Sequence, residues 1–386
     1  MLHLVRSFLE RGRRVDVLLC RAKGPLLSEI PAAANLVTLD PTPALYGRLM
    51  AALADPSSIP SMLRPVLLPL KTDADIRHLA ALRTYLKETR PDILLSALTY
   101  TNLIALWAKP LAGNSTPVVV SERIALSAHR KSEAGQRGWR WRYILPLVSH
   151  AYSRSDGIVS VSDSVADDLA SNTLINRTAI KTIYNPVVDD SLYQLAEEPL
   201  DHPWFNVETT PLILAAGRLI PQKGFRTLIH AFALVRSTKQ AKLMILGEGR
   251  QRTELESLIR ELGVEADVQM PGFVKNPYKY MSRASVFVLS SLYEGLPGVL
   301  TQALACGCPV VSTDCPGGSD EILAHGKYGR LVPVGDHAAI AAAIQSTLEE
   351  TTDQNILKHR ASLFSVDHAA QQYLSYLDGI AAKTAK

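Results

Sequence analysis

The chain has 386 residues, of which 47% are apolar and 20% are charged, and its formal net charge at pH 7 is +4. This length and composition are typical of a folded chain of two ordinary domains, and they exclude a disordered or fibrous protein. The longest apolar runs fall far short of the roughly 20 residues that a membrane-spanning helix requires, so we expect no such helix.

Short β-branched runs alternate with helical patterns along the whole chain. This alternation predicts an α/β protein in which helices cover both faces of parallel sheets. Six strand candidates lie in each half, so we expect two doubly wound domains. The candidates are residues 14–20, 35–40, 92–98, 117–122, 157–162, 180–186, 211–219, 241–249, 267–273, 285–291, 309–314 and 328–334.

Polar candidates for ligand contact follow the strand candidate at 117–122. They are Glu122, Arg123 and, a little further on, His129. Ligands of open parallel sheets bind outside the carboxyl ends of the strands, so these side chains are candidates for contact with a sugar or a phosphate. Two structural alternatives remain open: Glu122 could pair with Arg123, and a lone loop histidine is usually solvated.

Residues 129–154 carry much of the positive charge. Residues 1–200 hold 23 Lys and Arg against 19 Asp and Glu, whereas the remainder is balanced at 18 against 18. Basic and aromatic side chains beside an apolar face suit an anionic membrane surface or an acidic acceptor. The alternative is a solvated helix start whose tryptophans belong to the core. The alternating residues are Arg137, Trp139, Arg140, Trp141, Arg142 and Tyr143.

A division of the chain is expected near residue 190. Residues 185–205 are acidic, contain prolines and lack periodicity, so we place a linker there. The first domain is then residues 1–190 and the second is residues 191–365. Residues 366–386 read as a helix that can pack back on the first domain.

The first loop of the second half contains Gly217, Arg218, Lys223 and Gly224 ahead of an amphipathic helix. A guanidinium fork and an ammonium group on one short loop can both turn toward one anion, which predicts a diphosphate site. Taken alone, two basic residues in a loop are more often solvated surface.

In each of the next two motifs a single acid is followed by a glycine. Gly247 and Gly249 bracket Glu248 after a strand, although a lone Gly-x-Gly is weak evidence for a ligand site. In residues 289–323, Glu294 precedes a glycine- and proline-rich turn whose backbone amides we expect to point at a ligand. A carboxylate only accepts hydrogen bonds at neutral pH, so Glu294 suits sugar hydroxyls rather than phosphate.

The motifs of the second half form an ordered series: Gly217-Arg218 with Lys223, Gly-Glu-Gly at 247–249, Pro-Gly-Phe at 271–273, and residues 291–314. This series resembles the nucleotide-sugar-binding domain of retaining glycosyltransferases of the GT-B fold, family 4. More weakly, residues 118–124 and 153–169 resemble the acceptor domain of that family. The resemblance implies two Rossmann-like domains that face a cleft, with the donor on the second and the acceptor on the first.

The resemblance also implies residue roles. Arg218 and Lys223 would neutralise the leaving diphosphate, which needs fixed positive charge where negative charge develops. Glu294 would hold the donor sugar, residues 295–298 would meet the phosphates, and Glu122, Arg123 and His129 would lie on the acceptor side. The donor-binding candidates are Gly217, Gly247, Glu248, Gly249, Phe273, Val274, Gly295, Leu296, Pro297, Gly298 and Gln302, of which Phe273 and Val274 would contact the base. Such enzymes need no metal ion, and none is expected here.

Two features depart from the family pattern. The family's second glutamate is replaced by Gln302, whose neutral amide should weaken ribose binding by roughly 1–2 kcal/mol. The chain also opens inside a helix that follows the first strand in relatives, so we expect a first domain without its first strand. Without that strand, the edges of its neighbouring strands would be left unpaired. We therefore expect the true start to lie upstream of Met1.

We therefore expect a retaining glycosyltransferase of the hexosyltransferase type. It would move a sugar from a nucleotide-sugar, with UDP as the expected carrier, to a glycan or polyprenyl-linked acceptor in cell-surface polysaccharide or lipopolysaccharide synthesis. The expected location is the cytoplasm, with the inner face of the membrane as a candidate place, and no nucleic-acid partner is expected. Two alternatives remain: a nucleotide-sugar epimerase on the same fold, and a non-catalytic or impaired nucleotide-sugar-binding protein.

Overall fold

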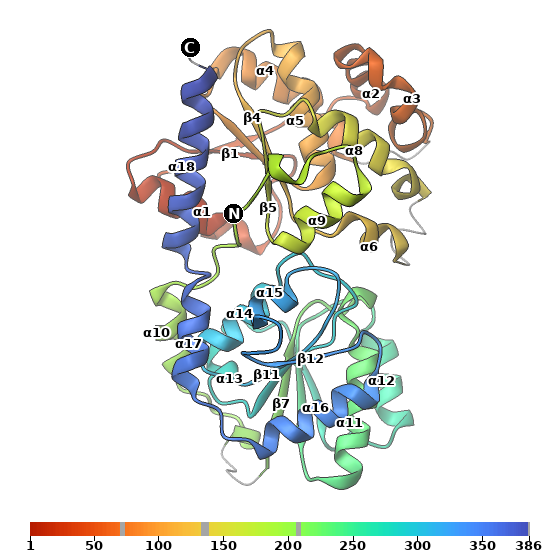
Figure 1. Cartoon of the computed structure of the whole chain (residues 1–386), viewed down its shortest axis with the longest axis vertical. Coiled ribbons are helices and arrows are strands. Elements are labelled where there is room, and N and C mark those ends of the chain that lie inside the picture. The colour runs from red at the N-terminus through yellow and green to blue at the C-terminus, as the bar shows by residue number, and fades with distance from the viewer. Residues whose placement is uncertain (70–73, 133–138, 206–209, 385–386) are drawn as a thin grey trace. The chain divides into compact units, whose positions relative to one another are not determined.

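The computed structural model describes residues 1–69, 74–132, 139–205 and 210–384, and the structural statements below refer to these ranges. The chain divides into two compact units (Figure 1). The first unit comprises Met1–Pro186 and Val366–Lys386, and the second comprises Val187–Ser365. The chain thus leaves the first unit after Pro186, a few residues before the expected boundary at 190, and returns to it at its carboxyl end.

All twelve expected strands are present, and each lies inside its predicted range. Every pairing between them is parallel, as the alternation of strands and helices predicted. The strands of the first unit are β1 (Asp16–Leu19), β2 (Asn35–Thr38), β3 (Leu94–Ala97), β4 (Val118–Glu122), β5 (Gly157–Ser160) and β6 (Ile180–Thr182). Those of the second are β7 (Leu212–Ala216), β8 (Lys242–Leu246), β9 (Val268–Gly272), β10 (Val286–Leu289), β11 (Val310–Thr313) and β12 (Arg330–Val332).

The sheet of the first unit is split. Strands β1 and β2 pair with each other, and β3, β4, β5 and β6 form a separate sheet in that order. No described strand joins β1 to β3. The helices of this unit are α1 (Leu2–Glu10), α2 (Ala44–Ala54), α3 (Ile59–Met62), α4 (Leu79–Thr89), α5 (Thr99–Ala112), α6 (Leu126–Lys131), α8 (Ile144–Tyr152), α9 (Asp163–Asn172) and α18 (Val366–Thr384).

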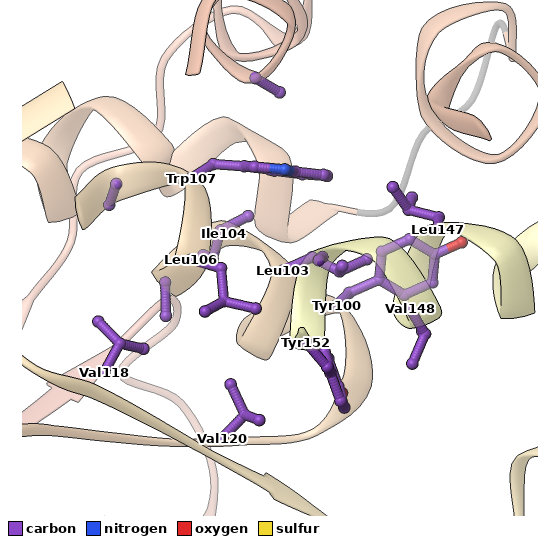
Figure 2. Close-up of a cluster of buried hydrophobic side chains, with 14 of the residues drawn as sticks. Tyr100, Leu103, Ile104, Leu106, Trp107, Val118, Val120, Leu147, Val148 and Tyr152 are labelled. Atoms are coloured by element: carbon purple, nitrogen blue, oxygen red, sulfur yellow. The ribbon is translucent and has the colours of Figure 1, made fainter. Parts of the chain in front are cut away.

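The core of the first unit lies between the sheet and the helices on one face. Strand β4 is buried along its whole length, because its run of three valines packs on both sides, as central parallel strands do. Figure 2 shows side chains of α5 and α8, among them Trp107, Leu147 and Tyr152, gathered beside Val118 and Val120 of β4. This packing holds the carboxyl end of β4 in one place.

The last helix, α18, packs on the other face of that sheet together with α1 (Figure 1). Tyr373 of α18 is buried in a cluster with Leu4 of α1 and Val119 of β4. Arg11 and Arg13, just after α1, form ion pairs with Asp367 and Asp378 of α18. Helix α18 is therefore an integral part of the first unit.

The segment that we expected to be an aperiodic linker contains a helix, α10 (Asp190–Glu197). The Asp189 carboxylate accepts a hydrogen bond from the Leu192 amide at 3.1 Å and caps this helix. The expectation was wrong because the helix is short and its buried positions, Leu192 and Ala196, give too few repeats to reveal a period.

The second unit has one six-stranded sheet in the order β12-β11-β10-β7-β8-β9. Its core is formed by these strands with α11 and α16, whose buried positions recur at helical spacing. Besides α10, its helices are α11 (Phe225–Thr238), α12 (Arg252–Glu261), α13 (Tyr278–Met281), α14 (Gly298–Ala305), α15 (Ser319–Leu323), α16 (His337–Glu349) and α17 (Gln354–Ser362).

Candidate active site

The strand order of the second unit reverses between β7 and β10. The chain runs outward from β7 through β8 to β9, and it runs outward in the other direction from β10 through β11 to β12. Strands β7 and β10 are direct neighbours, with Val286 paired to Ile213 and Phe287 to Leu214. Loops that leave neighbouring strands in opposite directions open a crevice at the carboxyl ends, which is where open α/β sheets bind ligands.

Two of the predicted catalytic residues meet at this crevice. Lys223, from the loop after β7, and Glu294, from the loop after β10, form an ion pair with 2.6 Å between Nζ and Oε1. Ser291 Oγ donates to the same Oε1 at 2.6 Å, while Oε2 accepts no hydrogen bond from any described residue. The carboxylate therefore keeps one oxygen for hydroxyl donors, and the ammonium group keeps two of its three N–H donors.

Arg218 lies in the same loop as Lys223 and is exposed. Its guanidinium group makes no hydrogen bond or ion pair within the described part of the chain, so it is available to an anion. Gly217 lies against the stem of Lys223, since a Cβ there would be 3.3 Å from Lys223 Cε. The small residue thus lets the lysine turn back along the end of β7 toward Glu294.

The Gly-Glu-Gly motif holds two loops together. A Cβ on Gly247 would lie 1.9 Å from Gly217 O, and one on Gly249 would lie 2.4 Å from Leu219 O. Both glycines are therefore required where the loop after β8 packs on the loop after β7. The Glu248 carboxylate accepts a hydrogen bond from Arg252 Nε at 3.0 Å, and this bond lowers the Glu248 pKa.

The turn at residues 295–298 is more enclosed than expected. Gly295, Leu296 and Pro297 are buried, and Gly298, the first residue of α14, is half-buried. The cause is the loop after β11: Gly318 N donates to Gly295 O at 2.7 Å, and a Cβ on Gly317 would lie 2.6 Å from Glu294 O. We expected these amides to point at a ligand; residues 295–297 are buried, and the direction of their amides stays a prediction.

The remaining donor candidates lie on α14 and in the loop that follows β9. Gln302 is half-buried on α14, and its Nε2 donates to the Tyr278 hydroxyl at 3.3 Å. Phe273 follows β9 and leaves 74% of its surface exposed, and Val274 beside it is half-buried. Within the described residues, no hydrogen bond or ion pair links Gln302, Phe273 or Val274 to the Lys223 and Glu294 pair.

On the first unit, Glu122 turns into the protein. Its side chain is 1% exposed and accepts from Tyr152 Oη at 2.9 Å, Thr99 Oγ1 at 3.2 Å and the Arg123 amide at 3.1 Å. Burial raises the pKa of Glu122 to about 7, although these hydrogen bonds oppose the shift. The expectation that Glu122 faces a ligand is corrected here: the acid joins the end of β4 to α5 and α8.

Arg123 and His129 are half-buried. The Arg123 guanidinium donates to Asn185 Oδ1 at 2.5 Å and does not pair with the Glu122 side chain. His129, on α6, contacts Trp141 edge to face with 4.4 Å between ring centroids, and burial lowers its pKa. Both residues lie beyond the carboxyl end of β4, as their sequence positions predicted.

The basic aromatic stretch at 129–154 is partly core. Trp141 packs on Tyr100 and His129, and the apolar face of α8 is buried in the first unit. Arg137 and the side chain of Trp139 lie outside the described residues. Arg142 remains exposed. This arrangement favours the alternative in which the aromatic residues of the stretch serve the fold.

Three residues of these clusters were missed from the sequence. Ser291 bonds Glu294, Tyr278 bonds Gln302, and Tyr152 bonds Glu122. Only Ser291 had a local signal, because a hydroxyl three residues before an acid at a strand end can reach its carboxylate. Tyr278 and Tyr152 lie 24 and 30 positions from their partners, so tertiary packing alone brings them together.

Two other kinds of feature are absent from the described residues. No group of three or more His, Cys, Asp or Glu side chains is placed to hold a metal ion in these ranges. No described helix combines the length and the hydropathy that a membrane span requires.

Comparison with known proteins gives matches in both units. The family model described as "Glycosyltransferase Family 4" matches residues 1–191, and the model described as "Glycosyl transferases group 1" matches residues 198–363. The chain is 32% identical over 287 residues to N-acetylgalactosamine-N,N'-diacetylbacillosaminyl-diphospho-undecaprenol 4-alpha-N-acetylgalactosaminyltransferase of Campylobacter jejuni, covering 73% of this chain and 75% of that protein. It is 27% identical to the lipopolysaccharide core biosynthesis glycosyltransferase LpsE of Rhizobium meliloti, with 82% and 81% covered.

Among solved structures, the chain is similar to HepE of Anabaena, determined in complex with UDP and glucose. The TM-score is 0.74 at 20% identity, with 98% of this chain and 94% of that chain covered. At this level of identity the likeness shows the fold.

Proposed function

Because this chain belongs to the glycosyltransferases, with a family 4 domain followed by a group 1 domain on the GT-B fold, we propose that it transfers a sugar from a nucleotide-sugar to a lipid-linked glycan. The observation that carries the proposal is the Lys223 and Glu294 pair at the point where the strand order reverses. Cation and acid lie side by side there, as a site for a sugar joined to a diphosphate requires.

In the proposed reaction the bond between the sugar and the diphosphate breaks, and an acceptor hydroxyl takes the sugar with its anomeric configuration retained and gives its proton to the departing diphosphate. Negative charge then develops on the leaving diphosphate. Arg218 and Lys223 stabilise that charge, and Lys223, which Glu294 already holds in place, needs little reorganisation during the reaction. Glu294 Oε2 accepts hydrogen bonds from the donor sugar and fixes its orientation.

The proposed donor is a UDP-sugar. The solved relative from Anabaena was determined with UDP and glucose, which supports uridine as the first nucleotide to test. Positive charge for the diphosphate comes from two side chains, so the proposed reaction needs no metal ion. Turnover should therefore persist after treatment with a chelator.

The proposed acceptor is a sugar on a polyprenyl diphosphate, in lipopolysaccharide or related surface polysaccharide synthesis. The relative from Campylobacter jejuni carries an undecaprenol-linked acceptor in its name, and the relative from Rhizobium meliloti is named for the lipopolysaccharide core. These names support the class of acceptor. The transferred sugar and the linkage are to be identified by the transfer assay described next.

The test is calorimetric titration of the full chain with UDP-, GDP- and ADP-sugars, followed by a transfer assay on undecaprenyl-diphosphate-linked sugars. We expect binding of a UDP-sugar and transfer to a lipid-linked acceptor, both reduced in Lys223→Ala. Binding without turnover on any acceptor would favour a non-catalytic binding protein. Nucleotide binding that does not depend on Lys223 and Arg218 would remove the diphosphate assignment.

A further inference from the structure

Helix α2 of the first unit is apolar on both faces. Its inner face, which includes Met50 and Ala51, is buried against α4 and α5. On the outer face, Leu45, Leu49 and Leu53 are 65%, 56% and 73% exposed. Their spacing of four residues stacks them along one side of the helix. A surface helix normally presents charged or polar residues to water, so the described residues supply no partner of the kind that the composition of this face implies.

The exposed apolar surface continues beyond α2. Ile59, Leu63 and Leu68, on α3 and the segment that follows it, are also exposed. Figure 1 shows α2 and α3 on the side of the first unit away from α1 and α18. These six aliphatic side chains and Tyr46 are thus exposed within one stretch of the chain, which we call the α2–α3 surface.

Within residues 45–68, the exposed charge of the α2–α3 surface is positive; Asp75, in the segment 74–78 that packs on α2, is half-buried and accepts a hydrogen bond from Thr101 Oγ1 at 3.1 Å. The only acid between residues 41 and 69 is Asp55, whose side chain is 2% exposed and pairs with Arg154 at 2.7 Å. Arg64 of the same stretch is exposed and lies over the Tyr143 ring, 4.5 Å from its centroid. Arg142, which directly precedes Tyr143 in the sequence, is exposed as well. Exposed cations therefore border the leucines, and the one acid is neutralised.

We infer that the α2–α3 surface docks on a bilayer that contains anionic lipid. The leucines of α2 enter the boundary between headgroups and acyl chains, as the apolar face of an interfacial helix does. Arg64 and Arg142 meet the negative headgroups. The membrane contact first considered for residues 129–154 is thereby assigned mainly to residues 45–68, because the apolar part of 129–154 is buried.

A second copy of the chain fits this surface less well. A twofold contact presents the same patch from both copies, so Arg64 and Arg142 would face their own counterparts. The stretch offers no exposed acid to pair with them, and like charges brought together oppose association. The choice of a bilayer also rests on the proposed function, in which the acceptor is carried by a lipid.

The test is co-sedimentation of the full chain with vesicles of phosphatidylcholine containing about one third phosphatidylglycerol, and with vesicles of phosphatidylcholine alone. The vesicles carry no sugar, so binding is read separately from transfer. We expect the wild-type chain to bind the anionic vesicles, and Leu45→Ser/Leu49→Ser/Leu53→Ser to lower the partition coefficient about tenfold or more. Arg142→Glu should lower it about fivefold or more.

The matched control is Leu174→Ser/Leu234→Ser/Ile356→Ser, which changes three exposed apolar residues elsewhere and should bind like wild type. Equal loss in both triple variants, unchanged binding of the α2 variant, or no vesicle binding by the wild-type chain would each overturn the inference. So would a wild-type dimer that the α2 substitutions dissociate without changing vesicle binding. Vesicle binding without transfer to any acceptor would remove the proposed function alone, and transfer without vesicle binding would remove the docking surface alone.

Discussion

The ion pair between Lys223 and Glu294 decides which substitutions test the site cleanly. Their side chains are 15% and 9% exposed, so replacing either partner leaves the other charge partly buried and unpaired. Such a change lowers stability and activity together. Arg218 is exposed and makes no described ion pair, so its effects on turnover and on folding can be separated.

We expect Arg218→Ala to lower kcat/KM about 10²- to 10³-fold, because it removes one of two cations from the developing negative charge. Its melting temperature should stay at the wild-type value, which differential scanning calorimetry measures. Arg260→Ala, an exposed arginine on α12, is the control and should keep full activity. An active Arg218→Ala enzyme would contradict the assignment of this residue to the diphosphate.

Gln302 gives a second prediction at this scale. Restoring an acid with Gln302→Glu should tighten binding of UDP about tenfold, because a charged acceptor binds ribose hydroxyls more strongly than an amide does. The Tyr278 hydroxyl, which now accepts from Gln302 Nε2, would donate to the new carboxylate. Calorimetric titration with UDP measures the change, and weaker binding in this variant would show that the amide is the better fit here.

At the scale of elements, the buried acid of the first unit connects three of them. Glu122 at the end of β4 binds Thr99 at the start of α5 and Tyr152 at the end of α8. Since burial raises its pKa from an ordinary value near 4.5 to about 7, the folded state keeps a proton that the unfolded state releases in this range. The contribution of this group to the free energy of unfolding is therefore independent of pH below about 4.5. It falls as the pH rises from about 4.5 to about 7, and above about 7 it no longer changes.

We expect wild type to lose about 2–3 kcal/mol of unfolding free energy between pH 5 and 7.5 relative to Glu122→Gln, which cannot titrate. Urea denaturation across this range, followed by a probe of the first unit, measures the difference. Glu88→Gln, at an exposed position of α4, should follow the wild-type curve. Parallel curves for wild type and Glu122→Gln would mean that the Glu122 pKa is not raised.

At the scale of the whole molecule, the chain leaves the first unit at Pro186 and returns to it at Val366. Helix α18 thereby closes the face of the first sheet that carries Val119 and Val159. Residues as far apart in the sequence as Arg11 and Asp367, which are 356 positions apart, then unfold together, and the second unit is inserted between them.

This arrangement predicts which unit a change in α18 affects. Tyr373→Ala should destabilise the first unit by about 3–5 kcal/mol, since it empties a buried site of aromatic size. Hydrogen exchange followed by mass spectrometry should show faster exchange in β4 and unchanged exchange in β8. Gln371→Ala, at an exposed position of the same helix, is the control. Faster exchange in the second unit alone would contradict the division of the chain.

Much of this protein follows from local sequence. The twelve strands, the parallel pairing and the order of the glycine and acid motifs all come from patterns within a few residues, because strand runs and turn residues encode their own conformation. Lys223 and Glu294 could also be named in advance, since each follows a strand whose carboxyl end faces a crevice.

Tertiary structure alone decided the rest. Glu122 follows a strand as Glu294 does, yet it is buried with a tyrosine 30 positions away, while Glu294 meets a lysine 71 positions away at the switch point. The leucines of α2 have the spacing of a core helix, and only the packing of the opposite face on α4 and α5 leaves them exposed. Local sequence patterns predict which residues form a helix or a strand. The direction in which a side chain points depends on neighbours that are distant in the sequence.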